Sequence, residues 1–94
     1  MAKGEKKAKK KIKPEQYFVV VDGTVLKNLK ELAMLFEDIS EDVFRHHVTD
    51  ERNDFSTWIR HVLEDKDLAN LLDSERELET FHKKLLMYVV RKHL

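Results

Sequence analysis

The residue types best suited to chemistry gather near the middle of this 94-residue chain. Histidine and carboxylate side chains can ligate a transition metal or transfer a proton, and a nearby tryptophan can line a small-ligand pocket. Asp54 and His61 are seven residues apart, which places them two turns apart on one face of a helix. The residues of this candidate ligand face are His46, His47, Asn53, Asp54, Trp58 and His61.

The same residues also have a structural interpretation, which the sequence favours. His46 and His47 are adjacent and point to different helix faces, so they do not readily share one ion, and their spacing matches no strong metal motif. In this interpretation Asp54 caps a helix and Asn53 bonds the preceding turn. His47 packs under Trp58, with a ring nitrogen bonded to a backbone carbonyl. We expect no metal and no cofactor, with a metal- or small-ligand-binding regulatory domain as the alternative.

Nucleophilic and phosphate chemistry find little support. The chain has no cysteine, and Ser56 lacks the flanking glycines that expose a catalytic serine. Gly4 and Gly23 are the only glycines, which excludes a glycine-rich phosphate loop. The sequence therefore predicts no catalytic residues and a protein that is not an enzyme.

The N-terminal segment carries the sharper functional signal. Residues 1–16 hold seven lysines against Glu5 and Glu15, a balance of +5, so the remaining residues sum to −5. Lysines in such an arm bind polyanions by releasing condensed counterions, which predicts contact with nucleic acid or an acidic partner. A purely solubilising tail remains the alternative, and the acidic body opposes strong nucleic-acid binding. The lysines concerned are Lys3, Lys6, Lys7, Lys9, Lys10, Lys11 and Lys13.

Length and composition indicate a disordered tail over 1–15 and one domain over 16–94. An apolar run over 17–21, then Asp22-Gly23, then 24–26 predicts a β-hairpin closed by a type I′ turn. Both faces of its first strand are apolar, which leaves either a fully covered hairpin or an edge open to a partner strand. We expect an α+β, helix-dominated fold, with the N-terminal hairpin packed on four or five short helices and a longer C-terminal helix.

Capping patterns divide the helical part. Asn28 and Ser40 are predicted N-caps of helices over 29–39 and 41–47, and Asn53 or Asp54 caps a third helix reaching about residue 63. A short helical turn is expected after Asp67. The capping-box spacing of residues 74–77 predicts that the last helix begins there and runs to the C-terminus.

The last helix is apolar over more than half its girth. Leu86, Met87 and Val90 lie off the main apolar stripe, which favours either a central helix or a homodimer formed through it. The longest apolar run, over 85–90, is far too short to cross a bilayer. With no cysteine and no sign of a membrane anchor, we expect a cytoplasmic protein.

Several short motifs between residues 16 and 72 together resemble a known domain pattern. Tyr17-Phe18, Asp22-Gly23 and 26–32 are followed by Val43-Phe44, His46-His47-Val48 and 53–59. This arrangement resembles a small, mainly archaeal domain family of unknown function over residues 16–72. The resemblance implies an accessory role and brings no activity; the lysine-rich segment and the last helix lie outside it.

Overall fold

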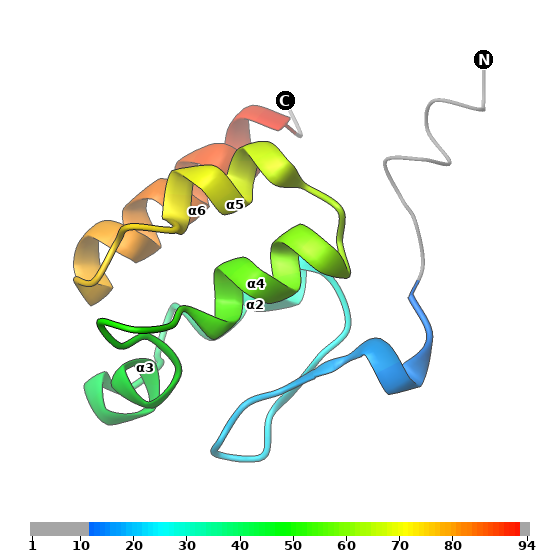
Figure 1. The fold of residues 1–94 in the computed structure, drawn as a ribbon, viewed down its shortest axis with the longest axis horizontal. Helices are drawn as coiled ribbons and strands as arrows, with labels where there is room; N and C mark the ends of the chain where they lie inside the picture. Colours follow the sequence, from blue (N-terminus) through cyan, green and yellow to red (C-terminus); the bar gives the residue numbers. More distant parts are fainter. Residues whose placement is uncertain (1–11, 93–94) are drawn as a thin grey trace.

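The computed structural model describes residues 12–92, and Figure 1 shows them as a hairpin beside a stack of helices. The predicted fold class is confirmed: a two-stranded antiparallel sheet is followed by five α-helices, the last being the longest. A short 3-10 helix, η1 (Pro14–Gln16), precedes the hairpin, and Pro14 occupies its first position, where no backbone N–H is needed. Ile12 is partly buried against the core, so contact with the body begins before the predicted domain boundary.

The hairpin has a different turn from the predicted one. Strands β1 (Phe18–Val19) and β2 (Val25–Leu26) pair with Phe18 opposite Leu26 and Val19 opposite Val25. The Gly23 N–H donates to the Val20 carbonyl, and Gly23 has a φ of 98°. A type I′ turn needs positive φ at both central residues, and among the described residues Gly23 shares a positive φ only with Glu64. The predicted type I′ turn is therefore wrong: the loop has three residues, and glycine supplies the left-handed conformation at its end.

Three predicted N-caps are confirmed by their hydrogen bonds. Helix α2 (Leu29–Leu35) begins at Asn28, α3 (Glu41–His47) at Ser40 and α4 (Asp54–His61) at Asn53. Each cap side chain accepts the backbone N–H three residues ahead, at 2.9 to 3.1 Å. These donors have no partner within the helix, which explains why a side-chain oxygen is needed at each start.

Two helix ends were predicted wrongly. Helix α2 stops one turn short of Ile39, because the Glu37 and Asp38 N–H groups donate to the carbonyls three residues back, and Ser40 then caps α3. Helix α5 (Lys66–Leu72) is followed by an irregular segment over 73–77, and α6 (Leu78–Lys92) begins four residues after the predicted cap, Ser74. Arg76 in that segment donates to the backbone carbonyls of Asp73 and Glu75.

Phenylalanine rings from several elements form the centre of the core. The Phe36 and Phe81 rings stack with centroids 5.1 Å apart, and Phe44 meets Phe81 edge-on at 5.4 Å. Phe55 of α4 contacts both Phe36 and Phe81. In Figure 1, α5 and α6 lie beside one another on one side of α4, while the hairpin lies on the other. The core thus links elements that are far apart in the sequence.

Candidate functional site

His47 is buried between the hairpin and two helices. The Val21 N–H donates to its Nε2 at 3.0 Å, and its Nδ1 lies 3.0 Å from Oδ2 of Asp54. Its ring also contacts Phe18 and Phe55, with centroids 5.1 and 5.2 Å away. The expected bond to a backbone carbonyl is wrong, because the imidazole accepts a backbone N–H instead.

This arrangement fits one tautomer of the neutral ring. A nitrogen that accepts a hydrogen bond carries no proton, so Nε2 is bare and Nδ1 donates its hydrogen to Asp54. The second oxygen of Asp54 lies 3.3 Å from Nε of Arg52. Both ring nitrogens of His47 are therefore engaged, and the ring could ligate a metal only by giving up one of these bonds.

Asn53 is buried at the other side of the same cluster. Its Oδ1 caps α4 by accepting the Ser56 N–H, and its Nδ2 donates to the Leu72 carbonyl at 3.0 Å. The Ser56 hydroxyl donates to Oδ1 of Asp73 at 2.7 Å and also lies 3.2 Å from the Asn53 carbonyl. Of the two residues predicted as alternatives for this cap, Asn53 and Asp54, it is Asn53 that caps α4, and it also ties α4 to the end of α5.

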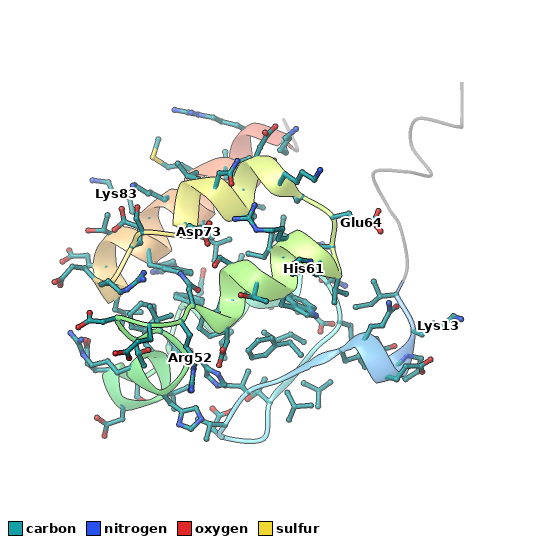
Figure 2. The ribbon with its side chains drawn as sticks, viewed as in Figure 1. Lys13, Arg52, His61, Glu64, Asp73 and Lys83 are labelled. Carbon is teal, nitrogen blue, oxygen red and sulfur yellow. The ribbon has the colours of Figure 1, made fainter. Side chains whose placement is uncertain are left out.

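The remaining candidates are Trp58, His61 and His46. The Trp58 indole donates to the Gln16 carbonyl at 2.8 Å, and the Phe18 ring lies between Trp58 and His47. His61 is exposed at the far end of α4 from Arg52, as Figure 2 shows. His46 is also exposed, although its ring makes a T-shaped contact with that of His47, with centroids 4.8 Å apart.

The structure therefore divides the candidate ligand face. His47, Asn53, Asp54 and Trp58 make internal hydrogen bonds, each bridging different parts of the fold. His46 and His61 do not join them. Within residues 12–92, no three side chains of the histidine, cysteine or acidic type are grouped to hold a metal ion.

A groove that the sequence did not predict lies between the second strand and two helices. Its volume is about 710 Å³, and β2, α2 and the start of α3 form its walls. The floor includes Leu35, Ile39 and Val43, which are half-buried, while Val25 and Met34 are exposed by 43% and 64%. Asp22, Glu31 and Asp38 add carboxylates to the lining.

The outer face of the hairpin continues this apolar surface. Val19 is 63% exposed and Val21 is 50% exposed, whereas Val20 and Leu26 are buried. The hairpin is therefore not fully covered. Leu86, Met87 and Val90 of α6 are likewise exposed, so a homodimer through this helix stays a prediction.

Two polar features of α6 escaped the sequence analysis. The Tyr88 hydroxyl bonds both carboxylate oxygens of Asp65, at 2.8 and 3.0 Å, and desolvation together with this bond raises the pKa of Tyr88. Nε2 of His82 is shielded from solvent and has no hydrogen-bond partner within the described residues. Tyr88 and Asp65 are 23 residues apart, so no local pattern could have paired them.

The lysine-rich segment is mostly outside the described residues. The residues that are not described include most of the predicted disordered tail over 1–15 and six of its lysines: Lys3, Lys6, Lys7, Lys9, Lys10 and Lys11. Lys13 is described and exposed. Among residues 12–92 no helix has the length and apolar character needed to span a bilayer.

No family model, curated protein or solved structure matches this chain, so the resemblance to an archaeal domain family stays a prediction.

Proposed function

We propose that this chain is a non-enzymatic binding module whose lysine-rich segment contacts nucleic acid or another acidic partner. The observation that carries the proposal is the separation of charge, with +5 in residues 1–16 and −5 in the rest. A segment of such charge attracts polyanions independently of their sequence. The cysteine-free composition agrees with the cytoplasm as its location.

The internal hydrogen bonds of the histidine and carboxylate cluster support a non-enzymatic role. Catalysis by general acid or base requires a group that can reach a substrate proton. His47 is 6% exposed, and both its nitrogens and the Asp54 carboxylate already have partners. The cluster is suited to holding the hairpin against α3 and α4.

The anchoring of η1 supports a role for the lysines as an arm of the folded body. The Gln16 carbonyl accepts the buried indole N–H of Trp58, and the Lys13 N–H donates to the Gln16 side chain at 3.0 Å. These bonds fix the point at which the lysine-rich segment joins the domain. A fixed attachment raises the local concentration of the arm near anything the body binds.

The test is the salt dependence of nucleic-acid binding by the full chain. Six bound lysines predict a slope of about −5 in a plot of log K against log salt for duplex DNA, and fewer contacts give a proportionally shallower slope. The test variant replaces the tail lysines by glutamine: Lys3, Lys6, Lys7, Lys9, Lys10 and Lys11. The control replaces as many exposed cations of the body: Lys27, Lys30, Lys66, Lys83, Arg91 and Lys92.

We expect the tail variant to lose binding and slope, and the control to keep both. Retained binding by the tail variant would contradict the proposal. An acidic polypeptide such as polyglutamate, used as competitor, identifies the partner class: binding of polyglutamate but not of nucleic acid points to an acidic protein.

A further inference from the structure

The groove between β2, α2 and α3 combines exposed apolar side chains with surplus negative charge. Within residues 22–43, which contain all its lining residues, the sequence has six carboxylates and two lysines, a balance of −4; Asp22, Glu31 and Asp38 line the groove itself, against Lys27. The whole of residues 17–94 sums to −5, so nearly all the net charge of the body belongs to this segment. The carboxylates are Asp22, Glu31, Glu37, Asp38, Glu41 and Asp42.

The charge of the groove is not cancelled from within. The lining residue Lys27 places its Nζ 5.9 Å from the centre of the Tyr17 ring, and Tyr17 is not part of the groove. Asp22 accepts the Thr24 N–H at 2.9 Å, and this bond lowers the pKa of Asp22 and keeps it ionised. Glu41, by contrast, is paired with Arg45 on α3.

We propose that this groove binds a basic amphipathic segment of a partner protein, with its large apolar side chains on the floor and its lysines or arginines against the carboxylates. Complementary charge selects such a partner and speeds its encounter. Charge alone would bind any basic segment. The exposed Val25 and Met34 add an apolar contact, which favours a segment with large apolar side chains.

The composition of the chain argues against its own lysine-rich segment as the occupant. Residues 1–11 have the positive charge, but beyond Met1 they contain only alanine as apolar residues, so they cannot cover the floor. This inference goes beyond the proposed function, because it concerns a separate surface that carries the opposite charge.

The probe is a synthetic helical peptide of leucine and lysine, about four turns long, titrated into the isotope-labelled full chain. One matched peptide carries glutamate in place of lysine, and another carries alanine in place of leucine. We expect only the first to shift the amide signals of Val25, Met34 and Asp38, because the glutamate peptide can reach only the lysine-rich segment. Equal shifts of these three signals with either matched peptide, or shifts elsewhere alone with the first, would overturn the proposal.

Substitutions then locate the contact. Met34→Ser and Asp38→Lys are expected to weaken peptide binding about fivefold to tenfold. Their controls, Met87→Ser and Asp50→Lys, make the same chemical changes at exposed positions outside the groove and leave affinity unchanged. Equal weakening in the controls would contradict the assignment.

Two further readouts separate the alternatives. Replacing the tail lysines by glutamine leaves the groove signals of the free protein in place; movement of those signals would show that the tail already fills the groove and would overturn the proposal. Met34→Ser retains every tail lysine, so it keeps nucleic-acid binding while losing the peptide. The experiments therefore distinguish a failure of the proposal for the groove from a failure of the proposed function of the lysine-rich segment.

Discussion

Two regions of this molecule both contain carboxylates and use them in opposite ways. Around His47 and Asn53, nearly every polar atom is turned inward and hydrogen-bonded between elements. Around the groove, carboxylates and apolar side chains stand together at the surface. The first region has the residue types of a catalytic site and the geometry of a structural joint. The second has no histidine in its lining, yet it combines apolar surface, hollow shape and charge.

Among the hydrogen-bonding side chains, the largest expected effect is at Asn53. Asn53→Ala removes the cap of α4 and one of the two donors to the Leu72 carbonyl, which keeps the Glu75 N–H, so we expect a loss of about 2 kcal/mol in the free energy of unfolding. Urea denaturation measures it. Asn28→Ala is the matched control, because Asn28 caps α2 from an exposed position and should lose only about 1 kcal/mol. Equal losses would mean that the Leu72 bond contributes nothing.

The next effect is at His47. His47→Leu keeps apolar contact with Phe18 and Phe55 but deprives the Val21 N–H of its acceptor, with an expected loss of about 1–2 kcal/mol. Hydrogen exchange at the Val21 amide should rise together with this loss. His46→Leu, at the exposed neighbouring position, is expected to stay within about 0.5 kcal/mol of the parent. If both variants lose the same free energy of unfolding, the internal hydrogen bonds of His47 do not stabilise the fold more than the exposed His46 does.

These two positions also show how far sequence reasoning reaches. The caps at Asn28, Ser40 and Asn53 were predictable because a cap acts on a backbone N–H only three residues away. The partner of His47 is 26 residues distant, and that of the Asn53 amide is 19. Local spacing could identify these side chains as important but could not find what they bind.

The start of the last helix was predicted wrongly although residues 74–77 have the capping-box pattern. Glu75 instead forms an ion pair with Lys84, nine residues ahead, and Arg76 bonds the backbone carbonyls of Asp73 and Glu75. A capping pattern contributes only about 1 kcal/mol, so it does not by itself decide where a helix begins. The groove was beyond prediction for a related reason, because it exists only once β2, α2 and α3 are assembled.

A third test asks whether the inward use of polar groups extends to the partly exposed Tyr88–Asp65 contact. The raised pKa of Tyr88 means that, as pH climbs above 10, the unfolded chain loses the phenol proton before the folded chain does. The contact therefore stabilises the fold below pH 10, and this contribution is lost as pH rises through the folded pKa. Tyr88→Phe should show a shallower alkaline fall in melting temperature, whereas Tyr17→Phe should follow the parent. A parallel fall in all three would contradict the assignment.

The smallest expected effect tests the other side of the comparison. A surface kept for a partner contributes little to the stability of the free domain, and Met34 is 64% exposed. Met34→Ser should therefore change the free energy of unfolding by less than about 0.5 kcal/mol in urea denaturation. Leu32 is on the same helix and fully buried, so Leu32→Ser should cost more than about 3 kcal/mol by opening a cavity and burying a hydroxyl.

If Met34→Ser is instead destabilising by more than about 1 kcal/mol, Met34 belongs to the core. The groove would then be an edge of the core and not a separate binding surface. A silent Met34→Ser that also weakens the leucine–lysine peptide would establish the division, because that side chain would then matter for binding and not for folding.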